Sequence, residues 1–242
     1  MAKLSKTQVD KLGDRLKAGP VEESDFAILD EYRKSFGDAY ESVVQAIQNK
    51  LGLEIPPGRS AKTTPSIIDK LRRESIRLSQ IQDVAGCRII VTDVIEQDRI
   101  VSALQKIFSQ ASITDRRSKP SHGYRAVHLI VTSHDRCVEI QIRTLLQHLW
   151  AQVSESLSDT FDPNIKYGGG GSTVQEYLTK WSSTVGRLEQ QETQFPAFAV
   201  SHEIMKKYLD MHNRVKAQLR QQLTIELDEV KQILEKQRRE SI

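Results

Sequence analysis

Cysteine is scarce in this chain, since the 242 residues include only Cys87 and Cys137. Two cysteines do not provide the disulfide framework that stabilises many small secreted proteins. Both lie in segments with the pattern of a β-strand, which predicts small buried thiols in a reducing compartment. Apolar runs are short as well: none approaches the ~20 residues that cross a bilayer, and the opening MAKLSK lacks a signal-peptide core. We therefore expect a cytoplasmic protein.

The chain also lacks a large excess of either positive or negative charge. The 35 Lys and Arg residues nearly balance the 32 Asp and Glu residues, which leaves a formal net charge of +3. This balance argues against bulk binding of nucleic acid through net charge. The basic residues do gather locally, in residues 59–77 and 116–125, where a solvated face is the simplest explanation of each cluster.

Two common ligand-binding patterns are incomplete. Lys166 and Tyr167 precede four glycines, but no Gly-Lys-Ser/Thr follows to make a P-loop, so a flexible linker is favoured over a phosphate-binding role. The spacing of His122, His128, His134 and Cys137 fits no zinc pattern.

The apolar spacing predicts a mixed α/β fold. Helical spacing occurs in residues 24–50, 65–77, 94–109, 144–158, 172–192 and 203–240. Ser24 and the Asp93-x-x-Glu96 pair resemble helix starts. Strand-like segments lie between these helices, so we expect a mixed β-sheet of about five strands wrapped by helices.

Three regions follow from this order of elements. We expect a flexible N-terminal segment at 1–23, one domain at 24–192 and a helical extension at 193–242. The apolar stripe of the last helix predicts either an intramolecular packing face or a contact with another copy or with a partner protein.

Residues 125–133 and 136–143 have the pattern of an antiparallel hairpin, with a turn at His134 and Asp135. Because a strand alternates its faces, Glu139, Gln141 and Arg143 should lie on one face and apolar residues on the other. An exposed face with a cross-strand ion pair would explain this row on its own.

A second carboxylate favours a catalytic explanation. Asp83 stands at the start of the apolar strand that contains Arg88. Two carboxylates on neighbouring strands, with cations around them, suit a metal-assisted phosphoryl transfer, because Mg²⁺ takes one or two protein oxygens and leaves its other positions to phosphates and water.

Together these segments resemble the synthetase domain of the RelA/SpoT family, which makes the alarmone nucleotides (p)ppGpp. The resemblance covers roughly residues 55–170 and rests on four blocks in the family's order: KTTPSIIDKL at 62–71, QDVAGCRI at 82–89, KPSHGYRAVH at 119–128 and EIQIRT at 139–144. It implies a nucleotidyltransferase-like fold. It also implies a Mg²⁺-dependent transfer of pyrophosphate from ATP to the 3′-hydroxyl of GDP or GTP in the stringent response.

The resemblance also implies roles for individual residues. Asp83, Glu139 and Gln141 fall at catalytic positions, and the first two of them are the implied metal ligands. The positions implied for ATP are Arg59, Lys62, Ser66, Lys70 and Arg88, with Arg88 stacked on the adenine. The positions implied for the acceptor are Lys119, Tyr124 and His128, with Tyr124 stacked on the base.

Some features depart from the family pattern. Ser60 stands where many members have an arginine, so Arg59, one residue earlier, is the substitute for the far side of the adenine. His122 stands where an asparagine often contacts guanine, which leaves the acceptor base open. The amino-acid sequence around Arg116 and around Tyr167 is also similar to that of a branch that includes toxins acting on the 3′ end of tRNA.

These departures define the alternatives. The acceptor could be tRNA or an adenosine nucleotide, and an antitoxin could then bind the C-terminal helix. A different class is an inactive module that binds nucleotide or RNA; the presence of both Asp83 and Glu139 argues against it. The turn at His134 and Asp135 does not supply the hydrolase half of bifunctional members.

Overall fold

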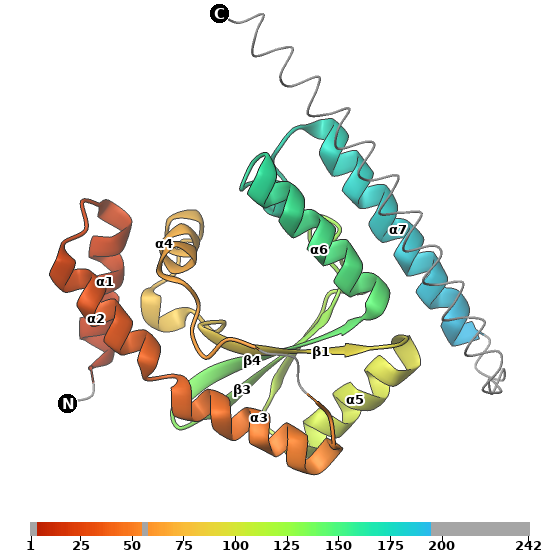
Figure 1. Cartoon of the computed structure of the whole chain (residues 1–242), viewed down its shortest axis with the longest axis horizontal. Helices are drawn as coiled ribbons and strands as arrows, with labels where there is room; N and C mark the ends of the chain where they lie inside the picture. Colours follow the sequence, from red (N-terminus) through yellow and green to blue (C-terminus); the bar gives the residue numbers. More distant parts are fainter. Residues whose placement is uncertain (1–3, 55–57, 195–242) are drawn as a thin grey trace, which may run out of the picture. The chain divides into compact units, whose positions relative to one another are not determined.

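The computed structural model describes residues 4–54 and 58–194, which form helices around one β-sheet (Figure 1). The sheet has the strand order β1-β4-β3-β2, and the strands are β1 (Ala85–Val91), β2 (Ser112–Asp115), β3 (Val127–Ser133) and β4 (Arg136–Thr144). β1 is parallel to β4, and the other pairs are antiparallel. The predicted mixed α/β fold is confirmed, but the described residues form four strands rather than about five.

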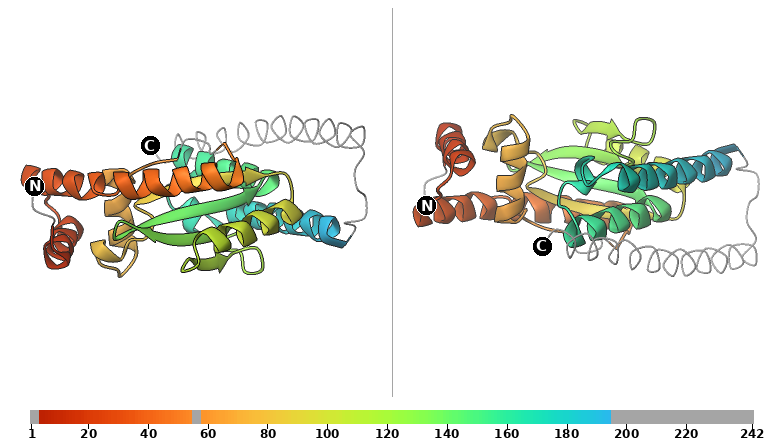
Figure 2. Two further views of the ribbon diagram at one scale, coloured as in Figure 1. Left: turned by 90° about the horizontal axis from the view of Figure 1, so that it is seen from below. Right: turned by 90° about the horizontal axis from the view of Figure 1, so that it is seen from above.

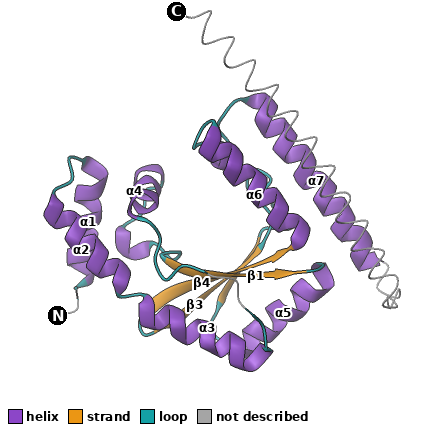
Figure 3. Cartoon of the chain, in the orientation of Figure 1, coloured by secondary structure: helices purple, strands orange, loops and turns teal. Residues whose placement is uncertain are grey.

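Seven α-helices and two short 3₁₀ helices lie around the sheet in the described part of the chain. They are α1 (Lys6–Ala18), α2 (Glu23–Lys34), α3 (Gly37–Leu51), α4 (Thr64–Arg73), η1 (Leu78–Gln80), α5 (Val94–Ile107), α6 (Leu145–Thr160), η2 (Ile165–Tyr167) and α7 (Ser172–Gln194). α3 and α5 cover one face of the sheet, while α4 and α6 stand over the other face (Figures 1 and 3). α7 runs beside α6 (Figure 2). None of these helices is long and apolar enough to cross a membrane.

The N-terminal segment is more ordered than its sequence suggested. Ser5 and Gln8 form a capping box at the start of α1, and the helix buries Val9, Leu12 and Leu16 in the main core. The prediction of a flexible segment at 1–23 is therefore wrong for α1. The helix is short and polar, and its apolar stripe has a partner only after the chain has folded.

The single helix predicted at 24–50 is two helices. α2 ends before Ser35 and α3 begins at Gly37, while Phe36 between them is buried with its ring edge-on to Tyr32, at 5.2 Å between centroids. The apolar spacing continues across the break because both helices face the same core. Glu22, not Ser24, occupies the N-cap position of α2. The helix predicted at 203–240 lies outside the described residues.

The hairpin is confirmed in strands, turn and faces. His134 and Asp135 have φ angles of 48° and 57°, as the two central residues of a type I′ turn require. Val138, Ile140 and Ile142 are fully buried, while Glu139 and Gln141 point to the other side of β4. The parallel pairing with β1 then places Glu139 beside Gly86 and Gln141 beside Arg88.

Two residues of α7, Leu178 and Glu189, hold the loop that precedes β3, and we call them the clamp. Gly123 has a φ of 86° and packs so closely on Trp150 that a Cβ there would lie 2.6 Å from the indole ring. The Trp150 indole in turn donates a hydrogen bond to the carbonyl of Leu178 on α7, at 2.9 Å. The order of this loop therefore depends on a helix that lies far along the chain.

Glu189 of α7 completes the clamp. Its buried carboxylate accepts hydrogen bonds from Arg125, at 2.9 and 3.1 Å, and from Thr144 and Gln147. We expect Glu189→Gln to lower the free energy of unfolding by roughly 2–3 kcal/mol, because it leaves the Arg125 charge inside without a counter-ion. Urea denaturation measures the change, and Glu176→Gln on the exposed side of α7 is the matched control. Equal stability of the two variants would contradict a clamp.

Candidate active site

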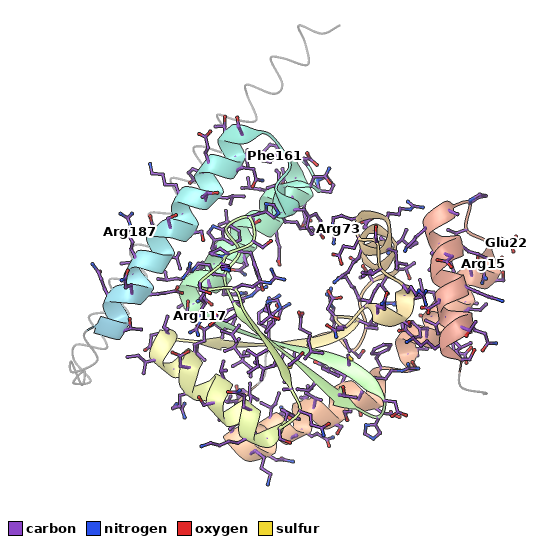
Figure 4. The ribbon with its side chains drawn as sticks, turned by 180° about the vertical axis from the view of Figure 1, so that it is seen from behind. Arg15, Glu22, Arg73, Arg117, Phe161 and Arg187 are labelled. Carbon is purple, nitrogen blue, oxygen red and sulfur yellow. The ribbon has the colours of Figure 1, made fainter. Side chains whose placement is uncertain are left out.

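A cleft of about 620 Å³ lies on the sheet face between α4 and α6. In Figure 4, Arg73 marks the end of α4 and Phe161 the end of α6, on opposite sides of this region. The walls come from both helices and from η2, and the floor comes from β1 and β4.

Most of the predicted site residues converge on this cleft. Those that line it are Arg59, Lys62, Ser66, Asp83, Arg88, Glu139 and Gln141. Lys70 joins them through an ion pair with Asp83. The predicted acceptor residues Lys119, Tyr124 and His128 do not line the cleft, although two of them contact residues that do.

Asp83 is held by two lysines. Its Oδ2 accepts from Lys62 Nζ at 2.7 Å and its Oδ1 from Lys70 Nζ at 2.9 Å. Burial raises the pKa of this carboxyl, but the two ammonium groups outweigh burial and bring the pKa to about 2. Lys62 stands just before the Thr63 cap of α4, and Lys70 lies in the last turn of that helix, so one short helix fixes both cations around Asp83.

Glu139 lies at the end of two hydrogen-bond chains. Its Oε1 is 2.7 Å from His128 Nδ1, and its Oε2 accepts from Gln141 Nε2 at 2.7 Å. His128 Nε2 lies 2.8 Å from the Tyr124 hydroxyl, and Arg143 Nη2 donates both to that hydroxyl and to Gln141 Oε1. Burial raises the pKa of Glu139, but the bond to His128 and the other contacts outweigh it and lower the pKa below its usual value.

Arg59 and Arg88 come together at the edge of β1. The backbone of Arg59 pairs with that of Gly86 through two hydrogen bonds of 3.0 Å. Gly58 makes this approach possible, because a Cβ there would lie 2.6 Å from the Gly86 carbonyl oxygen. Arg59 therefore reaches the cleft beside Arg88, even though Ser60 occupies the usual arginine position.

The ring of Tyr124 is already packed against protein. The Arg143 guanidinium lies 5.0 Å from the ring centroid, and the His128 ring meets Tyr124 edge-on at 5.6 Å. Trp150 contacts it from a further direction, at 6.4 Å. Stacking of an acceptor base on Tyr124 therefore stays a prediction. Lys119 is exposed on the loop before it.

One of the basic residues clustered at 116–125 is already paired with carboxylates. Arg117 donates to Asp115 and to Asp98, each at 2.7 Å, which raises its pKa above the usual value for arginine despite its burial. An arginine with two carboxylate partners has little left to offer a phosphate. Arg116 and Lys119 are the remaining candidates of that cluster.

Several residues that line the cleft were given no role in the site from the sequence. They are Asp69, Arg143, His148, Glu155, Asp159, Lys166 and Tyr167. Arg143 was detectable, because it continues the alternating row of Glu139 and Gln141. Tyr167 was not, since its place depends on the guanidinium of Arg73, which stacks 3.6 Å from the ring centroid across the cleft.

The chain is similar in sequence and in fold to known proteins. The family model described as a region found in RelA / SpoT proteins matches residues 59–158. An uncharacterized protein of Mycobacterium tuberculosis is 41% identical over 111 residues, which cover 44% of this chain and 41% of that protein. The chain thus spans about two fifths of the length of this relative.

Two Bacillus subtilis proteins match over more of their length. The GTP pyrophosphokinase YjbM is 33% identical over 155 residues, which cover 57% of this chain and 70% of YjbM. The crystal structure of the small alarmone synthetase 1 superposes with a TM-score of 0.51 at 26% identity, over 73% of this chain and 97% of that structure. Residues 59–158, which the family model matches, include both strands of the cleft floor, and the chain belongs to the RelA/SpoT family.

Proposed function

We propose that this chain is a pyrophosphokinase that transfers the β,γ-pyrophosphate of ATP to the 3′-hydroxyl of GDP or GTP. The product would be (p)ppGpp, the alarmone of the stringent response. The observation that carries the proposal is that Asp83 and Glu139 line one cleft together with Arg59, Lys62 and Arg88, while Lys70 of α4 forms an ion pair with Asp83. The similarity to YjbM, named a GTP pyrophosphokinase, supports it.

The residues fit a magnesium ion of the kind that binds with nucleotide. Within residues 4–54 and 58–194, no three His, Cys, Asp or Glu side chains group to hold a metal. Mg²⁺ needs only one or two protein carboxylates when phosphates supply the other ligands, and Asp83 and Glu139 would provide them. When bound, the ion would offset the charge of the transferring group.

The protein's own part is to hold the reactants and to take a proton. Lys62 and Lys70 carry charges that can turn from Asp83 to the phosphates of ATP, and Arg59 and Arg88 can enclose the adenine. The acceptor's 3′-oxygen then bonds to the β-phosphorus as the bond from that phosphorus to the α,β-bridging oxygen breaks, and AMP leaves. Glu139 accepts the proton of the attacking hydroxyl.

The acceptor is decided by one labelling experiment. Purified protein is incubated with γ-labelled ATP and with GDP, GTP, ATP or deacylated tRNA in turn. We expect label on GDP and GTP. Label on tRNA or on an adenosine nucleotide instead would replace the acceptor and keep the chemistry, and the exposed Lys119 would then be the first phosphate contact to test. Label on none of them would favour an inactive binding module.

Tyr124 and Arg88 should affect different substrates. We expect Tyr124→Ala to raise the acceptor's KM and to lower kcat/KM by roughly 10-fold to 100-fold through lost stacking. The KM for ATP should change little. Arg88→Ala should show the reverse pattern, because it removes the platform for adenine.

Tyr124→Phe is the control, since it keeps the ring and removes only the hydroxyl that contacts His128 and Arg143. We expect the phenylalanine variant to keep most of the wild-type affinity for the acceptor. If it is as impaired as the alanine variant, the hydroxyl rather than the stack is what matters.

A further inference from the structure

Arg143 is a buried cation whose partners are all neutral. Its side chain is 3% exposed, yet it lines the cleft. Nη2 donates to the hydroxyl of Tyr124 at 3.0 Å and to Oε1 of Gln141 at 2.9 Å. Nε and Nη1 are buried without a hydrogen-bond partner, and no carboxylate of the described residues lies within ion-pair distance.

Such a state is costly in a protein interior. A guanidinium stays protonated throughout the physiological pH range, so it cannot lose its charge to fit a buried place. A buried charge without a counter-ion destabilises the fold, and each unmade hydrogen bond adds to the cost. The nearby Arg117 and Arg125 show the ordinary solution, since each has a carboxylate partner.

A second guanidinium, that of Arg88, lies near Arg143 but is only half-buried. Arg88 lies on β1 opposite Gln141, two pairs along the strands from the pair of Ile90 and Arg143. Its Nε is also buried without a partner, and within the described chain it has no ion pair. Burial lowers the pKa of Arg88, and the Arg143 charge lowers it further. The carboxylate of Glu155, which lines the same cleft, acts on the pKa of Arg88 in the opposite direction, so Arg143 is the guanidinium that has no anion near it among the described residues.

The position along the sheet indicates which anion would bind. Asp83 with its two lysines precedes β1, and Glu139 lies opposite Gly86 near the start of that strand. Arg143 is four residues beyond Glu139 on β4, roughly 13 Å along the strand. Arg143 thus lies on the opposite side of Glu139 from the lysines that would hold the donor's phosphates.

We propose that Arg143 forms an anion subsite that binds the 5′-phosphate groups of the acceptor nucleotide. The identity of the ligand rests on the proposed function, because it assumes that the acceptor's 3′-hydroxyl lies at Glu139. The N–H groups of Arg143 that lack partners would donate to phosphate oxygens, and the anion would neutralise the charge of this guanidinium. Arg143 would then contact the acceptor directly while its Nη2 still holds Gln141.

The test compares a phosphorylated ligand with its unphosphorylated form. Isothermal titration calorimetry measures the binding of GDP, guanosine and inorganic pyrophosphate to the wild-type protein and to Arg143→Gln. We expect the wild type to bind GDP more tightly than guanosine. In the variant, the ratio of the affinity for GDP to the affinity for guanosine should fall by at least ~10-fold, since each contact between an arginine and a phosphate is a charge-assisted hydrogen bond. The affinity for inorganic pyrophosphate should fall together with the affinity for GDP.

Two further variants separate this role from a structural one. Arg143→Lys keeps the charge and should recover part of the preference for GDP. Arg136→Gln removes the same charge from the other end of β4, where the guanidinium lies over Tyr32 and Phe36, and should leave the preference unchanged within twofold. Thermal unfolding verifies that each variant is folded, and binding of a non-hydrolysable ATP analogue should be the same in all of them.

Three results would overturn the subsite. The first is a wild type that binds GDP no more tightly than guanosine. The second is an Arg143→Gln variant that keeps the full preference for GDP over guanosine. The third is an Arg143→Gln variant whose affinities for GDP and for guanosine fall by the same factor. The transfer assay with labelled ATP is read separately. If the wild type transfers no label but Arg143→Gln still loses the preference for GDP over guanosine, the proposed function is refuted and the anion subsite is supported.

Discussion

Replacing Glu139 by glutamine is expected to lower kcat/KM for pyrophosphate transfer by at least ~100-fold and to leave the protein folded. The change removes the negative charge and the basicity of the side chain while keeping its size. Both proposed roles of Glu139, acceptance of the hydroxyl proton and contact with Mg²⁺, need a carboxylate. Steady-state kinetics with the best acceptor from the labelling experiment measures the loss.

The hydrogen bonds of Glu139 make a stability control necessary. Both of its oxygens accept, from His128 and from Gln141, so a glutamine must turn its NH₂ group toward one of these two donors. Urea denaturation shows whether this costs stability. Glu155→Gln removes a carboxylate from the same cleft without touching Glu139, and we expect its activity to stay within about tenfold of the wild type. A Glu139→Gln variant that works within a few-fold of the wild type would make Glu139 a structural residue.

Local patterns predicted the parts of the fold that decide the site. The hairpin and its faces followed from alternation of Val and Ile with polar residues, and the register then set Glu139, Gln141 and Arg143 in one row. The order of α1 and the break after α2 could not be predicted in this way. Both depend on contacts with segments distant in sequence, such as that of Gly13 in α1 with Leu78.

The residues of the candidate site likewise fall into those that local motifs predicted and those that contacts distant in sequence put in place. The residues expected at the ATP and the metal come from short motifs next to β1 and β4, so their convergence follows from the sheet. The place of Tyr124 was harder to predict, because Arg143 and Trp150 cover its ring. The partner of Arg125 is Glu189, 64 residues away on α7, and no spacing in the sequence points to it.

The Asp83→Asn variant should lose activity and lose part of its response to Mg²⁺, because the carboxylate is the proposed metal ligand. We expect a decrease in kcat/KM of at least ~100-fold, with a higher Mg²⁺ concentration needed for half-maximal rate. Asp69→Asn is the matched control, since Asp69 is exposed on α4 and lines the same cleft. Full wild-type activity in saturating chelator would refute the metal-assisted mechanism as a whole.

The same variant should also be less stable, and the pH dependence identifies the reason. The folded pKa of Asp83 is about 2, below the usual value of 3.8, so its ion pairs stabilise the fold above pH 4 and that stability is lost as the pH falls toward 2. Asp83→Asn should therefore be less stable than the wild type by roughly 2 kcal/mol near neutral pH, and the difference should shrink below pH 4. Urea denaturation from pH 7 to pH 3 measures both. A difference that persists at low pH would mean that Asp83 stabilises the fold through packing rather than through its ion pairs with Lys62 and Lys70.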